Sequence, residues 1–177
     1  MPESTSQAPN SVNIRGEILA ACDLSEYSLP VLRMAARMAA DLKRQLMVVH
    51  VIHHRDIDSV TYAMRMEGLF SEVPSPEEFV KKLTQERVRA IQGLMTRAGA
   101  GRFLTKLEIV VGHPFEALMK VIESRGVYMV IIGSKGRGRI DGLLAGSTAE
   151  KLLSRCPVPL LCVPQAAENN RLEKDAL

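Results

Sequence analysis

The sequence contains no tryptophan, and only three tyrosines and four phenylalanines among 177 residues. Proteins that bind single-stranded nucleic acid stack bases on aromatic side chains, and this chain offers few such platforms. Its charge is also nearly balanced, because 23 Lys and Arg residues against 20 Asp and Glu residues leave a formal charge of +3. That excess is too small to indicate a protein that wraps a polyanion. Both shortages argue against a nucleic-acid-binding function.

Long hydrophobic runs are absent as well. No apolar stretch approaches the roughly 20 residues that a helix needs to cross a bilayer. The first residues, Met1 to Asn13, are polar and lack the basic and apolar regions of a signal peptide. We therefore expect a cytoplasmic protein.

Cysteine is scarce. Cys22, Cys156 and Cys162 lie within or beside apolar runs. Their spacing matches neither a zinc site nor a thioredoxin-type motif, and the few histidines do not complete one. We expect reduced, mostly buried thiols and no metal site built from protein side chains.

The chain does contain enough apolar residues, 46% of the total, for one domain with a substantial core. Short apolar runs predict five buried strands, at residues 18–22, 46–52, 107–111, 127–132 and 158–163. Helical spacing and start signals predict helices at residues 29–42, 76–97, 114–125 and 147–155. Strands that alternate with helices are typical of a parallel sheet covered on both faces. We expect a single α/β domain over residues 15–164, with tails at residues 1–14 and 165–177.

Two segments near helix starts are informative. Ser75, Pro76 and two following glutamates form a strong N-terminal signal for the second helix, whereas residues 25–28 offer only cap candidates for the first.

Residues 53–74 show no clean periodicity of apolar residues. This stretch is either a functional excursion or an irregular insertion.

A glycine-rich loop follows the fourth strand. Residues 133–139 read Gly-Ser-Lys-Gly-Arg-Gly-Arg and lie at the carboxyl edge of the predicted sheet, where open α/β folds bind ligands. Glycines allow positive φ and a close approach of the backbone to an anion. Gly146, Ser147 and Thr148 start the final helix, whose N-terminus offers unpaired N–H donors and the Ser147 hydroxyl. The two segments together indicate a phosphate site.

The loop matches neither of two established phosphate-binding motifs. Gly133 and Gly138 have the P-loop spacing, but Arg139 and Ile140 stand where that motif has Lys and Ser or Thr. The dinucleotide fingerprint fails too, because Gly142 comes one residue late and after the wrong strand. On these residues alone, a glycine turn without a ligand is an equally good interpretation.

The spacing Gly133-x2-Gly136-x9-Gly146-Ser147 resembles the nucleotide-binding signature of the ATP-binding universal stress proteins. Four further segments are similar to that family in the same order: residues 18–25, 50–52, 110–114 and 156–159. They correspond to the first strand with its terminal Asp, the end of the second strand, a Gly-x-Pro turn and the entry to the last strand. The resemblance implies an adenine nucleotide alpha hydrolase-like fold, an open five-stranded parallel sheet in the order 3-2-1-4-5 with helices on both faces. It also implies a homodimer, through the strand at residues 158–163.

The resemblance further implies that ATP binds at the carboxyl edge, with any Mg or Mn ion held through its phosphates. The resemblance implies six nucleotide contacts: Asp23, Val51, Gly133, Gly136, Gly146 and Ser147. Arg137 of the basic loop and Thr148 beside Ser147 complete the set of candidate site residues. Asp23 and Val51 would contact adenine or ribose. The glycines and Ser147 would hold ribose and phosphates.

Several of these residues have a second interpretation. Asp23 could equally cap a turn or helix, and Val51 could be a core residue. The basic residues within 135–139 would either neutralise a triphosphate or form a solvated charge cluster. His53 and His54 end the second strand at the ligand edge, but neighbouring strand residues point to opposite faces, so we favour a structural role for both.

Three functions are compatible with these residues. The favoured one is an ATP-binding regulatory or stress-response protein. A slow ATPase or phosphotransferase is the second, although it needs a positioned nucleophile and usually a held metal, for which only Asp23 and Asp141 are at hand. An interaction module of the same fold that binds no nucleotide is the third. We expect weak hydrolysis at most.

Overall fold

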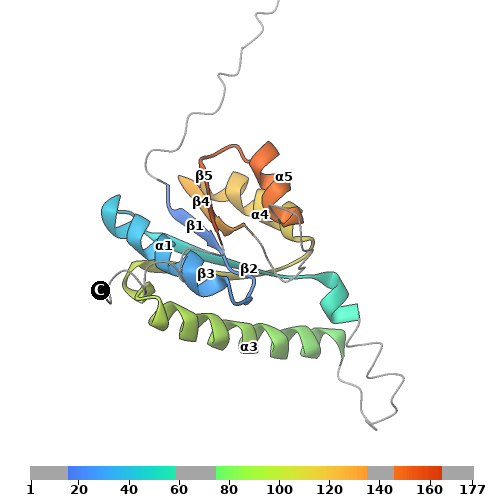
Figure 1. Ribbon diagram of the computed structural model, residues 1–177. Coiled ribbons are helices and arrows are strands. Elements are labelled where there is room, and N and C mark those ends of the chain that lie inside the picture. The colour runs from blue at the N-terminus through green and yellow to red at the C-terminus, as the bar shows by residue number, and fades with distance from the viewer. Residues whose placement is uncertain (1–15, 59–74, 135–145, 165–177) are drawn as a thin grey trace, which may run out of the picture.

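The computed structural model describes residues 16–58, 75–134 and 146–164. Its five strands are β1 (Ile18–Ala21), β2 (Leu46–Ile52), β3 (Leu104–Val111), β4 (Met129–Gly133) and β5 (Leu160–Val163). Its helices are α1 (Ser28–Asp41), α3 (Pro76–Arg97), α4 (Pro114–Arg125), α5 (Ser147–Arg155) and the short 3-10 helix η1 (Gly101–Phe103). Residues 54–58 are also helical. The strands form one parallel sheet in the order β3-β2-β1-β4-β5, which confirms the predicted topology (Figure 1).

Two hydrophobic clusters cover the two faces of this sheet. Ile18 and Ala20 of β1 pack with α1 and α3 in the first cluster, and Leu19 of β1 packs with α4 and α5 in the second. Successive side chains of a strand point to opposite faces, so a strand that is buried on both faces reads as a continuous apolar run. The packing therefore explains why short apolar runs located the strands in the sequence. Among the described helices, none has both the length and the hydropathy that a membrane crossing requires.

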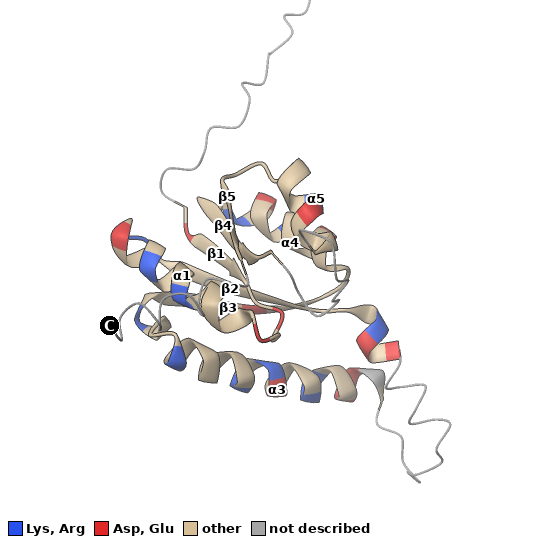
Figure 2. Ribbon diagram, in the orientation of Figure 1, with Lys and Arg blue, Asp and Glu red and all other residues tan. Residues whose placement is uncertain are grey.

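The start of α3 is the element that the sequence predicts best. The Glu78 N–H donates to Ser75 Oγ at 3.2 Å, and the Ser75 N–H donates to the Glu78 carboxylate at 3.0 Å. This capping box, with Pro76 at the first helical position, pairs backbone donors that would otherwise lack partners. Lys and Arg residues are spaced along the helix (Figure 2), which ends at Arg97 as predicted.

Some boundaries differ from the prediction. β3 starts at Leu104 rather than Leu107, because it already pairs with β2 there although Lys106 and Glu108 interrupt its apolar pattern. β5 starts at Leu160 rather than Val158, since the prolines on either side of Val158 lack the N–H that a ladder needs. β1 ends at Ala21, before Cys22, and β4 lies slightly later than predicted, at Met129–Gly133. The N-cap of α1 is Tyr27, without a side-chain cap, so the expected polar cap at this helix was wrong.

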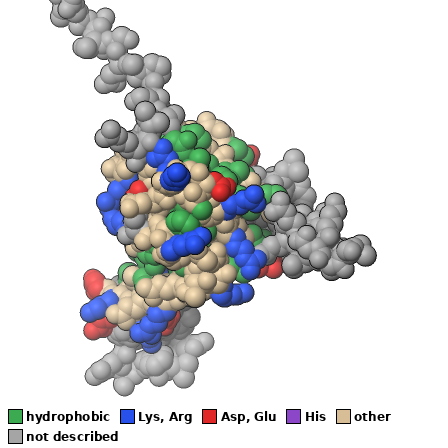
Figure 3. Space-filling view, turned by 90° about the vertical axis from the view of Figure 1, so that its left-hand side faces the viewer, with side chains coloured by type: hydrophobic (Ala, Val, Ile, Leu, Met, Phe, Trp, Pro, Cys, Tyr) green, Lys and Arg blue, Asp and Glu red, His purple; other side chains and the backbone are tan. Residues whose placement is uncertain are grey.

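Basic side chains gather on the side of the molecule where α1 and α3 end (Figure 3). Figure 3 looks onto the left-hand side of Figure 1, where α1 and α3 end, and there Lys and Arg side chains outnumber Asp and Glu. Arg97 closes α3, and Lys43 and Arg44 follow α1. Basic residues near helix C-termini offset the negative end of the helix dipole. The carboxyl edge of the sheet instead receives helix N-termini, which favour anions.

Candidate functional site

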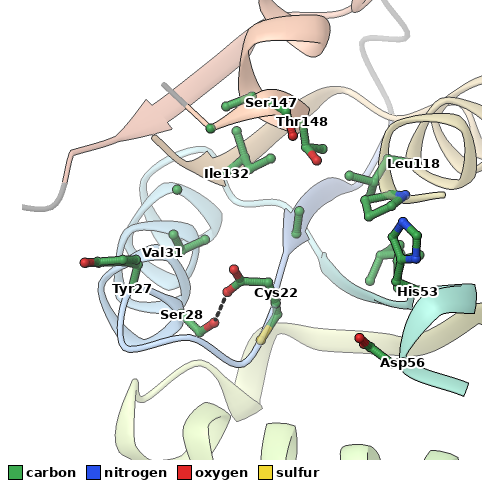
Figure 4. Close-up of a pocket in the computed structure, with 18 of the residues that line it drawn as sticks. Cys22, Tyr27, Ser28, Val31, His53, Asp56, Leu118, Ile132, Ser147 and Thr148 are labelled. Carbon is green, nitrogen blue, oxygen red and sulfur yellow. Dashed lines mark hydrogen bonds between the residues drawn. The ribbon is translucent and has the colours of Figure 1, made fainter. Parts of the chain in front are cut away.

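A cavity of about 470 Å³ opens at the carboxyl edge of the sheet (Figure 4). It lies where the chain order reverses, because β2 and β3 continue on one side of β1 and β4 and β5 lie on the other. Open α/β sheets place ligands at this switch point, and the volume suits a small molecule of nucleotide size. The structure brings together here the predicted site residues that it describes: Asp23, Val51, Gly133, Gly146, Ser147 and Thr148. Gly136, Arg137 and the rest of the basic loop lie outside the described residues.

Asp23 follows β1 at the rim of this cavity. Its Oδ1 accepts hydrogen bonds from the Ser25 N–H at 3.0 Å, the Ser25 hydroxyl at 2.6 Å and the Ser28 hydroxyl at 3.0 Å. Among the described residues, no donor pairs with Oδ2. The turn-forming role and the ligand-facing role are therefore compatible, because they use different oxygens of one carboxylate.

The strand beneath Asp23 is fixed by a buried histidine of β2. His50 is 2% exposed, and its Nδ1 lies 2.7 Å from the Cys22 carbonyl oxygen. The Cys22 N–H in turn donates to the Val49 carbonyl at 2.9 Å. A buried polar pair of this kind must stay satisfied, so it fixes the backbone at the point where β1 leads into Asp23.

The opposite end of the cavity is the start of α5. Gly146 is the N-cap, and no side chain caps this helix. The N–H groups of Ser147, Thr148 and Ala149 have no hydrogen-bond partner among the described residues, as expected for a first helical turn. Figure 4 shows Ser147 and Thr148 at the cavity, above Ile132. Free N–H donors at the positive end of a helix dipole suit an anion.

Two glycines at this site, Gly133 and Gly146, do not adopt positive φ, whereas Gly136 and Gly138 lie outside the described residues. Gly146 has φ −71° and ψ 154°, an extended conformation open to any residue. Gly133 ends β4 and is not among the glycines with positive φ. The advantage of glycine at position 146 is instead the missing side chain, since a cap by Ser or Asp would occupy the donors that face the cavity.

The position of Val51 is compatible with both roles considered for it, a contact to the ligand and a core residue. Its half-buried side chain packs against the second hydrophobic cluster, and it lines the cavity next to β1. The strand alternation that sends Val51 toward α4 therefore gives the cavity an apolar floor.

Sequence reasoning did not assign one wall of the cavity to the site: it placed His53 at the ligand edge but favoured a structural role for it, and it did not single out the other residues of this wall. His53, Arg55 and Asp56, directly after β2, line the cavity opposite the first turn of α1. Pro114 and Leu118 of α4 also line the cavity, and Figure 4 shows Leu118 beside His53. Their only sequence signal is position, because the carboxyl end of β2 and the start of α4 meet at the same edge of a parallel sheet.

The described part of the chain holds no group of three or more His, Cys, Asp or Glu side chains arranged to bind a metal ion. The lining of the cavity combines the Asp23 carboxylate, apolar walls and the backbone N–H donors at the start of α5. These groups suit a ligand with a flat, partly polar ring at one end and negative charge at the other.

Comparison with known proteins supports this view of the fold. Universal stress protein MJ0577 of Methanocaldococcus jannaschii is 29% identical over 151 residues, covering 83% of this chain and 93% of that protein. Its solved structure aligns with a TM-score of 0.64 at 25% identity, over 86% of this chain and 97% of that one.

Two further solved structures share the fold at lower identity. One is a universal stress protein in complex with cAMP, with a TM-score of 0.56 and 19% identity over 84% of this chain and 95% of that one. The other is the universal stress protein of Archaeoglobus fulgidus in complex with dAMP, with a TM-score of 0.53 and 18% identity over 84% of this chain and 98% of that one. The model of the Universal stress protein family itself matches residues 15–164, and the chain therefore belongs to the universal stress protein family.

Proposed function

We propose that this universal stress protein binds ATP in the cavity and acts as a nucleotide-dependent regulatory protein. One observation carries the proposal. The lining of a single cavity includes Asp23 on the β1 side, whose Oδ2 has no donor among the described residues, and the first turn of α5 on the β4 side, whose N–H groups have no acceptor among them. An adenine nucleotide has matching groups, since its amino group donates and its phosphates accept. Relatives of the same fold in complex with cAMP and dAMP add support.

The proposal assigns an orientation. The adenine amino group donates to Asp23 Oδ2, and the ring lies over Val51. The phosphates lie at the first turn of α5, where backbone N–H groups and the Ser147 hydroxyl donate. Guanine presents a carbonyl oxygen where adenine has its amino group, so its lone pairs would face the carboxylate. This arrangement therefore favours adenine over guanine.

Thermal unfolding with added nucleotide tests the proposal. At 100 times the dissociation constant, a ligand that binds only the folded protein stabilises it by about 2.7 kcal/mol. For a domain of this size we expect ATP to raise Tm by roughly 5–10 °C, and GTP to raise it less. The Asp23→Ala variant should lose most of its own ATP shift, whereas Ser147→Ala should lose only part, because the backbone donors remain.

Asp41→Ala serves as the matched control. Asp41 is an exposed carboxylate at the end of α1, pairs with Arg37 at 3.7 Å and is not among the residues that line the cavity. This variant should keep the full ATP shift. If millimolar ATP leaves the Tm of the wild-type protein unchanged, or if Asp23→Ala responds as the wild type does, the proposed site is wrong.

A further inference from the structure

The wall formed after β2 contains a histidine whose ring is held in one orientation. The Arg55 N–H donates to His53 Nδ1 at 3.0 Å, and the Asp56 N–H donates to the His53 carbonyl at 2.9 Å. The His53 ring also packs edge-to-face on His113, with ring centroids 5.0 Å apart at 86°. His113 is itself positioned as the N-cap of α4. Contacts from two separate elements thus orient the His53 imidazole.

The contact to Arg55 determines which ring nitrogen carries the proton. A neutral imidazole has one donor nitrogen and one acceptor nitrogen. Because Nδ1 accepts from a backbone N–H, the proton of neutral His53 lies on Nε2. Among the described residues, no acceptor pairs with this Nε2–H group. His53 therefore adds an oriented, free donor to the cavity wall.

The order of the strands in the sheet indicates which part of a ligand lies near this donor. β2 lies next to β1 and is separated from β4 by it. With strands about 4.8 Å apart, the end of β2 lies roughly 10 Å from the end of β4, beside which α5 begins. His53 follows β2 by one residue, so it lies on the side of Asp23 and Val51, away from the α5 donors. The same wall holds Leu118, an apolar neighbour suited to a ring.

We propose that His53 is a nucleoside-binding residue whose Nε2–H donates a hydrogen bond to an acceptor on the base or ribose of the bound nucleotide. This inference rests on the proposed function and adds a contact from a segment outside the glycine signature. It gives the nucleoside two contacts of opposite kind, an acceptor from Asp23 and a donor from His53. Neither contact involves the phosphates.

Two substitutions separate this role from a purely structural one. His53→Asn places an amide oxygen where Nδ1 accepts from Arg55, but it has no donor at the position of Nε2. His53→Gln reaches the position of Nε2 with an amide donor, but it leaves the Arg55 N–H without its acceptor. We expect calorimetric titration to show ATP binding about 3- to 10-fold weaker in His53→Asn, the effect of one neutral hydrogen bond. Binding to His53→Gln should stay within about twofold of the wild type.

The nucleotide series and a control complete the test. The weakening in His53→Asn should be the same for ATP, ADP and AMP, because the contact is to the nucleoside. His54→Asn should leave all three affinities unchanged, because His54 also contacts His113 but does not line the cavity. If the loss of affinity in His53→Asn increases from AMP to ADP to ATP, the assignment of His53 to the nucleoside is wrong.

Three other results would also overturn the inference, and they can be told apart. If His53→Asn binds ATP as the wild type does, His53 makes no nucleoside contact, while the proposed function stands. If His53→Gln binds ATP more weakly than the wild type and His53→Asn does not, the role of the ring is to accept the hydrogen bond from the Arg55 N–H. If the wild-type protein binds none of the three nucleotides, the proposed function fails and the inference fails with it.

Discussion

At the scale of single residues, the backbone reverses sharply just after β1. Leu24 has φ 62°, a left-handed conformation that costs a residue with a Cβ about 1–2 kcal/mol. The side chain of Leu24 packs against the first hydrophobic cluster, and the hydrogen bonds from Ser25 and Ser28 to Asp23 hold the turn. Strain of this kind persists where the surroundings over-determine the backbone, and it gathers at ligand sites. Here it presents the Asp23 carboxylate to the cavity.

Burial also determines the chemistry of two thiols, Cys156 and Cys162. Removal from water raises the pKa of both; at Cys156 a hydrogen bond with the Val158 backbone acts in the opposite direction and is the smaller effect. The thiolate is the reactive form of cysteine, so both side chains should react slowly at neutral pH. Cys22 is buried, and all three cysteines are free, as the sequence predicts, although Cys156 and Cys162 are only partly buried.

We expect iodoacetamide to modify Cys156 and Cys162 at pH 8 more slowly than it modifies glutathione, and urea to remove the difference. The sign for stability follows from the raised pKa. The free energy of unfolding should be unaffected by these thiols below the unfolded pKa of about 8.5 and should fall as the pH rises from there toward the folded pKa. Mass spectrometry of the modified peptides gives the rates at which iodoacetamide reacts with Cys156 and Cys162. Modification faster than that of glutathione would contradict the expected burial effect.

At the scale of the elements, helix ends show what local sequence can and cannot predict. The capping box at Ser75 is local chemistry, so the sequence predicts the start of α3 correctly. The start of α1 is different, because Ser28 is the first helical residue and its hydroxyl bonds to Asp23 rather than capping the helix. That preference depends on the turn at Leu24, which no spacing rule reveals.

Two helix ends offer a paired prediction on stability. Lys43 after α1 and Gly126 after α4 both have left-handed backbones, with φ 51° and 61°. Glycine adopts this conformation without the Cβ clash that other residues meet. We expect Lys43→Gly to raise the free energy of unfolding by about 0.5–1 kcal/mol and Gly126→Ala to lower it by about 1–2 kcal/mol.

Urea denaturation at fixed protein concentration measures both changes. Lys43→Ala is the control, since alanine keeps the Cβ and should bring no gain. Equal stabilities for Lys43→Gly and Lys43→Ala would show that the backbone at position 43 carries no strain. The outcome for Gly126 is independent, because the two helices cover opposite faces of the sheet.

At the scale of the whole molecule, the alternation of short apolar runs with helices is enough to predict a covered parallel sheet. The strand order came from the family resemblance, which the structure confirms. The candidate site draws on Asp23, Val51 and Gly146, residues far apart in the chain that only the sheet topology brings together. The sequence placed His53 at the ligand edge but not its ring in the cavity wall, because the orientation of the ring depends on the contacts with Arg55 and His113, neither of which leaves a pattern in the sequence.

The two edges of the sheet differ in how they are protected. On β3, Glu108 pairs with Lys106 at 3.0 Å and with Arg125 of α4 at 3.3 Å. Charges on an edge strand discourage pairing with another chain. The opposite edge, β5, reads Leu-Leu-Cys-Val and carries no charged side chain. We therefore propose, in agreement with the family resemblance, that two copies of this chain pair along β5.

The register of β5 shows which backbone groups such a dimer would use. The Val130 N–H donates to the Pro159 carbonyl and the Ser134 N–H donates to the Val163 carbonyl, each at 2.9 Å. Positions 159, 161 and 163 therefore face β4, and by strand alternation the backbone of Leu160 and Cys162 faces away from the sheet. Leu161 is unsuited as a test position, because its side chain packs against the first hydrophobic cluster.

Cys162→Pro removes one outward N–H without touching the ladder to β4, and an edge strand tolerates proline at such a position. Light scattering on the wild-type protein at tens of micromolar should give about 39 kDa, twice the 19.5 kDa of one chain. The proline variant should give the monomer mass with an unchanged circular dichroism spectrum. Cys162→Ala, which keeps the N–H, should remain dimeric. A wild-type monomer would refute the dimer. A dimeric and folded Cys162→Pro would place the contact elsewhere, because across a two-fold axis the substitution removes one N–H from each copy and so two hydrogen bonds from the dimer.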